Sequence, residues 1–171
     1  MSADPQAVFL VDGYSNPAIL RINGRASYVN SAPVGKFFNQ MVKEQKSSVV
    51  VDFADCTSMD STFLGILAGA ALDFKNMKPP GTLTLCRLGA RNLELIRNLG
   101  LHRLLRVDSG DFDMTFEGEA AAMLDTLDRS EIATARTILK AHENLVAADQ
   151  GNLNKFQDVI DYLRVQVEKE N

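Results

Sequence analysis

The chain of 171 residues has no tryptophan, five prolines and two cysteines, Cys56 and Cys86. Two cysteines at this separation form neither a disulfide framework nor a zinc-binding pattern, so a small disulfide-stapled fold is excluded. No apolar run approaches the ~20 residues that a membrane-spanning helix needs. The net charge of −4 and a pI of about 5.2 give no basic surface for nucleic acid or an anionic membrane. We therefore expect neither nucleic-acid binding nor direct membrane insertion.

Several enzyme and cofactor motifs are also missing. There is no Gly-x-Ser-x-Gly elbow, no phosphate-binding loop and no dinucleotide fingerprint. A calcium loop counted from Asp111 would have Phe116 where glycine is required and Ala122 where glutamate is required. The first residues, Met-Ser-Ala-Asp-Pro, lack the basic-then-apolar order of a signal peptide. The sequence thus predicts a cytoplasmic protein with reduced thiols and neither metal nor cofactor.

The charge is distributed unevenly between two parts of the chain. Residues 1–116 contain 12 Lys and Arg against 11 Asp and Glu, whereas residues 117–171 contain 6 against 11. The first part is nearly neutral at +1, and the second carries −5. We therefore divide the chain into a domain over residues 1–116 and an extension over 117–171.

The first part alternates between strand and helix patterns. The β-branched run Val49–Phe53 is nearly continuous, which is typical of a central strand covered on both faces. The helix from Leu64 to Lys75 is apolar nearly all round, and Gly65 and Gly69 indicate close packing against a neighbour. Strands are predicted at 8–11, 18–23, 49–53, 83–88 and 104–107, with helices from 30 or 31, at 64–75 and at 90–99. This alternation predicts an α/β fold with a mixed sheet of four to five strands packed with helices.

The second part shows helix patterns only. We expect a linker over 108–129 and two helices, at about 130–149 and 153–169, with Ser130 and Asn152 as N-caps. Their apolar residues recur at steps of three and four, which predicts an antiparallel helical hairpin. The apolar stripes can close on each other, on the first domain or on a second copy of the chain. His142 lies on the first stripe, where a packing role is expected.

The loop from Asp55 to Thr62 carries the chemistry. It places two acids and four hydroxyls at or beside a helix N-terminus, where unpaired N–H groups and the helix dipole favour an anion. A phosphate on Ser61 would find donors there and would add about −1.5 to −2 charges at an exposed hydroxyl. The alternative is that Ser61 or Asp60 only caps the helix. Cys56 lies in the same loop, and we expect it to be an inert, buried thiol; a redox role is the weaker hypothesis.

At this point the sequence resembles a known family. Met59-Asp60-Ser61-Thr62-Phe63-Leu64-Gly65, placed after a buried strand, is similar to the Met-Asp-Ser-Ser-Gly-Leu-Gly signature of the STAS domain of sulphate transporters and anti-sigma factor antagonists. The resemblance extends to Gly24 and to the segment 93–101, which ends in the Gly-Leu pair usual for the family's late helix. It covers roughly residues 8–116 and not the extension.

The resemblance implies a phosphorylation site at Ser61, with Thr62 as a second acceptor. It also implies a partner-binding surface formed by Gly24, Arg25, Ser58, Met59, Asp60, Ser61, Thr62 and Phe63. Two positions depart from the family pattern, because Phe63 replaces a glycine and Arg25 replaces a glutamate. Both departures affect the identity of the partner more than the fold.

The mechanism implied by the resemblance is partner switching in the control of transcription. The unphosphorylated domain would bind an anti-sigma factor that is also a serine kinase, phosphorylation of Ser61 would release it, and a serine phosphatase would reset it. The protein would then be a binder and not an enzyme. Two alternatives are a non-phosphorylated STAS subunit of a membrane lipid or anion transport complex, and an enzyme with Ser61 as nucleophile. The second is disfavoured because both histidines lie far along the chain. For the hairpin we expect homodimerisation or regulation of the switch surface.

Overall fold

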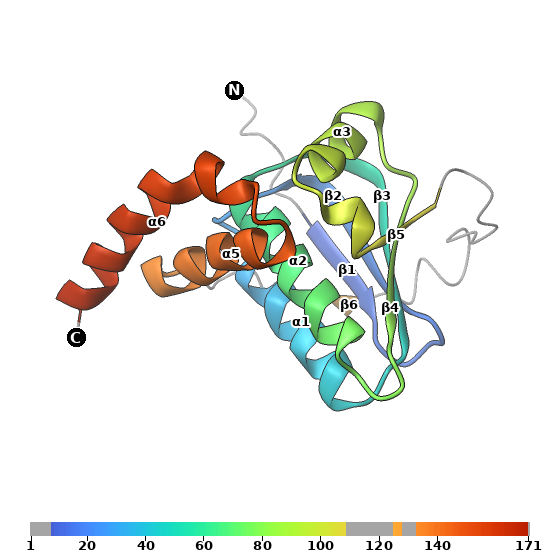
Figure 1. Cartoon of the computed structure of the whole chain (residues 1–171). Coiled ribbons are helices and arrows are strands. Elements are labelled where there is room, and N and C mark those ends of the chain that lie inside the picture. The colour runs from blue at the N-terminus through green and yellow to red at the C-terminus, as the bar shows by residue number, and fades with distance from the viewer. Residues whose placement is uncertain (1–7, 109–124, 128–132, 171) are drawn as a thin grey trace, which may run out of the picture.

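The alternating strands form one mixed sheet in the computed structural model, which describes residues 8–108, 125–127 and 133–170 (Figure 1). Its strands are β1 (Val8–Asp12), β2 (Ala18–Ala26), β3 (Ser48–Met59), β4 (Thr82–Cys86), β5 (Arg106–Val107) and β6 (Asp125–Thr126). They lie in the order β5-β4-β3-β2-β1-β6. Strands β2 to β5 pair in parallel, and β1 is antiparallel to both β2 and β6. The α/β class is confirmed.

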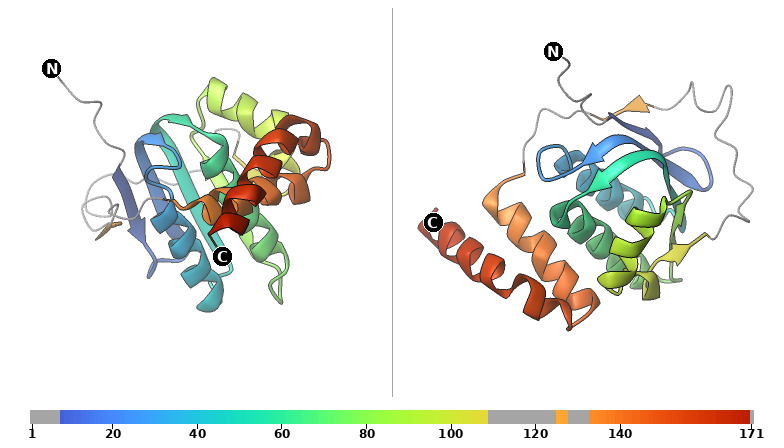
Figure 2. Two further views of the ribbon diagram at one scale, coloured as in Figure 1. Left: turned by 90° about the vertical axis from the view of Figure 1, so that its left-hand side faces the viewer. Right: turned by 90° about the horizontal axis from the view of Figure 1, so that it is seen from above.

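The helices form layers on one side of this sheet. They are α1 (Ala32–Lys43), α2 (Ser61–Lys75), α3 (Ala90–Asn98), α5 (Ala135–Ala148) and α6 (Asn152–Lys169), with a 3-10 turn η1 (Leu101–Arg103). Helices α1 and α2 cover one face of the sheet, α5 packs on α2, and α6 lies outermost against α5 (Figure 2). The hairpin has therefore closed on the first domain as well as on itself.

Strand β3 is the central strand that its composition predicts. Its segment Val49–Phe53 is at most 1 % exposed, and its neighbours β2 and β4 pair with it on both edges. Helix α2 is enclosed in the same way, between the sheet and α5. A Cβ atom on Gly65 would overlap the carbonyl group of Ala141 in α5, and one on Gly69 would overlap the amide of Asn144. The close packing expected at both glycines is thus a contact with the C-terminal hairpin.

The last predicted strand, 104–107, is shorter in the structure. Strand β5 has two residues, Arg106 and Val107, and the 3-10 turn η1 lies just before the predicted strand. The turn and the residues after it place the side chains of Leu101 and Leu105 in the core. Gly100 has φ of 73°, as expected for the residue after a helix.

The second part of the chain is not purely helical. Strand β6 lies within the predicted linker 108–129 and pairs with the free edge of β1. Helix α5 begins at Ala135, with the Thr134 hydroxyl accepting from the Thr137 N–H, so the start expected near residue 130 was wrong. Ser130 and the domain boundary at 116/117 lie outside the described residues. Asn152 is the first residue of α6 and not its cap, which is Gly151.

Helix α5 buries more surface than its predicted stripe covers. The buried side chains are Ala141, His142 and Leu145. Of these, only His142 belongs to the stripe predicted from the sequence, which consists of Ile132, Ala135, Leu139, His142 and Val146. The reason is that α5 has two neighbours, so that α2 and α6 each take one of its faces. In α6, Ile160, Leu163 and Val167 are buried as expected, but Leu153 is 41 % exposed.

Candidate functional site

Asp60 fixes the start of α2. Its Oδ1 accepts a hydrogen bond from the Phe63 N–H at 2.9 Å, which makes it the N-cap. Its Oδ2 accepts from the Tyr28 N–H at 2.8 Å and so ties the β2–α1 connection to the helix. Because Asp60 performs the capping, Ser61 becomes the first helical residue and its hydroxyl is available for another contact.

That contact comes from the C-terminal hairpin. Ser61 Oγ lies 2.9 Å from Nε2 of His142 in α5, 81 residues along the chain. His142 Nδ1 lies 2.8 Å from the carbonyl oxygen of Ile138, which can only accept, so Nδ1 carries the proton. In the neutral imidazole Nε2 is then the acceptor, and the serine hydroxyl donates to it. The exposed hydroxyl expected from the sequence is therefore half-buried and paired.

His142 is held rigidly in this position. It is 3 % exposed, and its ring contacts that of Phe156 in α6 edge-on, with centroids 5.2 Å apart. The expected packing role is correct, but the contact with Ser61 could not be predicted from the residue pattern. The histidine also removes the reason given against a nucleophilic serine, since a base lies within hydrogen-bonding distance. What orients that base is a backbone carbonyl and not the carboxylate of a Ser-His-Asp triad.

A cavity of about 440 Å³ opens beside Ser61. Most of its lining residues are apolar, and α6 contributes Lys155 and Phe156 to the lining. Lys155 Nζ donates to the carbonyl oxygen of Asn98 at 2.6 Å, at the end of α3. The other lining residues are Met59, Leu64, Leu95, Asn98 and Leu99. The lysine is the only charged side chain among these described lining residues, and the sequence did not indicate it.

The sheet brings the remaining predicted residues together. Gly24 pairs with Cys56, and Arg25 pairs with Ser58, where β2 and β3 run in parallel towards α2. Gly24 has φ of 96°, which only glycine adopts readily, and a register shift follows it. Arg25 is exposed and Ser58 is half-buried, so both are accessible beside Asp60.

Three residues of the predicted surface point inward. Phe63 is fully buried and stacks on Phe9 of β1, with ring centroids 6.3 Å apart. Thr62 is 4 % exposed and Met59 is 8 % exposed. In this conformation the aromatic at the family's glycine position fills the core and does not alter a docking surface. Conversely, Tyr28 and Val29 are about half exposed next to Asp60 and were not predicted.

Burial changes the chemistry of both thiols. Desolvation raises the pKa of the Cys56 thiol to about 11, against weaker lowering by the Ser58 backbone and by Asn92. Desolvation, together with the charge of Asp52, raises the pKa of the Cys86 thiol to about 12. Thiolate, the reactive form, is therefore scarce at neutral pH. This favours the inert role expected for Cys56, although its side chain is only partly buried.

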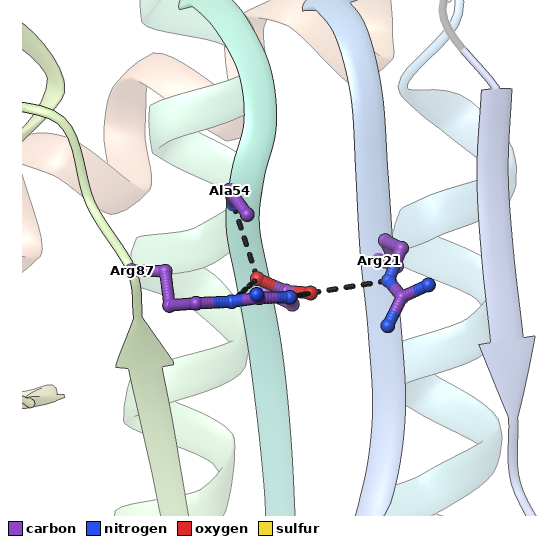
Figure 3. Close-up of polar contacts among 4 residues, drawn as sticks. Arg21, Ala54 and Arg87 are labelled. Atoms are coloured by element: carbon purple, nitrogen blue, oxygen red, sulfur yellow. Dashed lines mark hydrogen bonds and ion pairs between the residues drawn. The ribbon is translucent and has the colours of Figure 1, made fainter. Parts of the chain in front are cut away.

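A second charged cluster lies on β3, away from Ser61. The Asp52 carboxylate is fully buried and lies between the Arg21 and Arg87 guanidinium groups (Figure 3). Arg21 Nε lies 3.1 Å from Oδ2, Arg87 Nε lies 2.9 Å from Oδ1, and the Ala54 N–H also donates to Oδ1. The hydrogen bond to Asp52 raises the pKa of Arg87. The β-branched pattern of Val49–Phe53 predicts only a strand, so the ion pairs of Asp52 within it were not predicted from the sequence.

Two further searches concern only the described part of the chain. No group of three or more His, Cys, Asp or Glu side chains in residues 8–108, 125–127 and 133–170 is arranged to hold a metal ion. None of the helices within those ranges is both long and apolar enough to cross a membrane. Asp111, considered above for calcium, lies outside them.

Comparison with known proteins agrees with this architecture. The family model of the STAS domain matches residues 9–117. Comparison with curated proteins finds no match. Among solved structures, an anti-sigma factor antagonist from Mycobacterium paratuberculosis matches with a TM-score of 0.53 and 18 % identity, over 65 % of this chain and 92 % of that one. About a third of the present chain is outside that match.

Two structures of SpoIIAA show weaker likeness, each with a TM-score of 0.49 and 13 % identity. The anti-sigma factor antagonist SpoIIAA in its unphosphorylated form matches over 63 % of this chain and 89 % of that one. The Bacillus cell fate determinant SpoIIAA in the phosphorylated form matches over 59 % and 91 %. At these identities, the likeness to solved structures concerns the fold alone.

Proposed function

The chain belongs to the STAS domain family, and on this basis we propose that it is a phosphorylation-controlled binding module of the anti-sigma factor antagonist type. The observation that carries the proposal is the position of Ser61. It is the first residue of α2, directly after the capping Asp60, and its hydroxyl has no capping role. Phosphorylation there would add charge without disturbing the buried core.

In this proposal the unphosphorylated protein binds an anti-sigma factor that is also a serine kinase. The docking surface consists of Arg25, Ser58, Asp60 and Ser61, to which we add the exposed Tyr28. The kinase transfers phosphate from ATP to Ser61, the partner is released, and a serine phosphatase restores the first state. Arg25 gives this surface a positive charge, so the partner is expected to present an acidic side chain opposite it.

The proposal is tested by intact mass after incubation with ATP and candidate serine kinases. We expect one added phosphate in the wild type and in Thr62→Ala, and none in Ser61→Ala. Ser61→Asp should weaken binding to the anti-sigma factor by about tenfold or more, because it places a second acid beside Asp60. Absence of phosphate under all kinases, together with retained partner binding, would favour the alternative of a non-phosphorylated subunit of a membrane lipid or anion transport complex.

The contact between Ser61 and His142 calls for a separate test of catalysis. A serine activated by histidine attacks esters, and p-nitrophenyl acetate is a sensitive probe of such a nucleophile. We expect no hydrolysis above the background of the Ser61→Ala variant, because His142 is almost fully enclosed and its orienting partner is an uncharged carbonyl. Hydrolysis that disappears in Ser61→Ala and His142→Ala would contradict a purely binding role.

A further inference from the structure

The C-terminal hairpin places one basic side chain on Ser61 and a second in the adjoining cavity. His142 of α5 contacts its hydroxyl directly, and Lys155 of α6 lines the cavity into which the Ser61 side chain faces. The two helices pack side by side, with α5 between α2 and α6 (Figure 2). The hairpin also contributes Phe156 to the cavity, but His142 and Lys155 are its two basic side chains at this site, and neither belongs to the part of the chain that matches the family model.

Lys155 is positioned by contacts with the domain. Its ammonium group donates to the Asn98 carbonyl. One turn earlier, the Asn152 amide donates to the carbonyl oxygens of Leu99 at 2.9 Å and of Leu145 at 2.7 Å. Asn152 is 1 % exposed, so this amide joins α3, α5 and α6 at a buried point. The start of α6 is therefore fixed against the end of α3, beside the cavity.

We propose that the hairpin binds phosphoserine at position 61 of its own chain. The proposal rests on the phosphorylation in the proposed function. The γ-phosphoryl group of ATP is transferred to Ser61 Oγ by the kinase; the bond to ADP breaks, and the hydroxyl proton passes to solvent. The phosphoryl group enters the 440 Å³ cavity, where Lys155 supplies an ion pair. His142 no longer receives a hydrogen bond from the serine; it takes up a proton from solvent, and the resulting imidazolium donates from Nε2 to a phosphoryl oxygen while Nδ1 keeps its bond to the Ile138 carbonyl.

The consequence is a change in what holds the hairpin to the domain. In the unphosphorylated chain one neutral hydrogen bond links Ser61 to the hairpin. In the phosphorylated chain two charge-assisted contacts replace it, and these are about twice as strong as neutral ones. The charge of Asp60 reduces the gain, but both its carboxylate oxygens already accept backbone N–H groups. Release of an outside partner would then follow from competition, because α5 occupies the adjoining face of α2.

The test uses the full chain with phosphoserine installed at position 61 by codon suppression, so that no kinase is needed. Hydrogen exchange of the α5 amides reports on docking of the hairpin. We expect exchange to slow by about tenfold on phosphorylation, since the new contacts are charge-assisted. Lys155→Ala should remove most of this slowing. Lys169→Ala, an exposed lysine at the far end of α6, should keep it and serves as the matched control.

Two results would overturn the proposal. Faster exchange of α5 in the phosphorylated chain would mean that the phosphate expels the hairpin. Equal exchange in the two forms would mean that the hairpin does not detect the phosphate. His142→Gln, which retains a polar side chain of similar reach, provides a second variant and should reduce the slowing without unfolding the hairpin. None of these results depends on a partner or kinase, so failure to find either would contradict the proposed function separately.

Discussion

The α/β domain and the C-terminal hairpin are held in place by different kinds of contact. The domain buries large apolar side chains between sheet and helices, such as Phe9 stacked on Phe63. The hairpin meets the domain through small residues and hydrogen bonds, including those of His142 and Asn152, with Leu145 as the main apolar side chain. When polar groups separate, water replaces their lost hydrogen bonds, so the net loss in stability is small. When an apolar core opens, its surface is exposed to water and the full hydrophobic stabilisation is lost. We therefore expect the hairpin to detach more easily than the domain unfolds.

The largest expected effect comes from breaking the domain at its buried charge. Asp52→Ala leaves the Arg21 guanidinium, which is 12 % exposed, without its carboxylate. Removing one partner of a buried ion pair costs about 3–5 kcal/mol, and we expect this loss in the free energy of unfolding by urea. Asp55→Ala, an exposed acid on the same strand, is the control and should change stability by less than about 1 kcal/mol. Equal effects of the two substitutions would show that the cluster does not stabilise the domain.

An intermediate effect is expected from detaching the hairpin alone. In Gly65→Ala the new methyl group meets the backbone of Ala141, so overpacking should weaken docking by about 1–3 kcal/mol. Hydrogen exchange of α5 should accelerate while that of β3 is unchanged. The control is Gly35→Ala in α1, where the nearest atom is Ile66 Cγ2 at 3.7 Å. That variant should gain up to about 1 kcal/mol from helix propensity. A gain in both variants would contradict the close approach of α5.

The smallest expected effect is a pH dependence of stability that arises from two buried thiols of the domain and not from the hairpin. The folded state raises the thiol pKa of Cys86 from 9.0 to about 12 and that of Cys56 to about 11. The folded protein therefore binds these protons more tightly than the unfolded chain does, and the contribution of the two thiols to stability is fully present below pH 9. This contribution to the free energy of unfolding is lost progressively as the pH rises from 9 towards 11 and above. Urea unfolding at pH 8 and pH 10 should show a smaller decrease for Cys86→Ala than for the wild type. An identical decrease would exclude this contribution.

Prediction from the sequence succeeded where local pattern and burial coincide. The run Val49–Phe53, the glycines Gly65 and Gly69 and the helix stop at Gly100 all have a local signature, and each occupies the expected position. Prediction was less successful where an element has two neighbours. Helix α5 faces both α2 and α6, so its buried face is wider than a single stripe, and Ala141 and Leu145 were missed.

The candidate site divides in the same way. Ser61 and the adjoining Asp60 were found because a helix start has a recognisable order of residues. His142 and Lys155 meet Ser61 only through packing of segments about 80 and 94 residues away, and no spacing rule connects them. Phe63 was assigned to the partner-binding surface because it stands close to Ser61 in the family signature. A helix turns by about 100° per residue, so a neighbour in sequence can point to the opposite side.

The short strand β6 determines how far a detached hairpin can move. It holds the chain against the edge of β1, and the Leu127 N–H adds a bond to the carbonyl of Phe9 at 2.9 Å. Among the described residues, the next one along the chain is Ala133, whose N–H donates to the Tyr28 carbonyl. The five residues between them span roughly 20 Å at most. Such a short tether gives an effective local concentration on the order of millimolar, so an outside partner must compete with a ligand that never diffuses away.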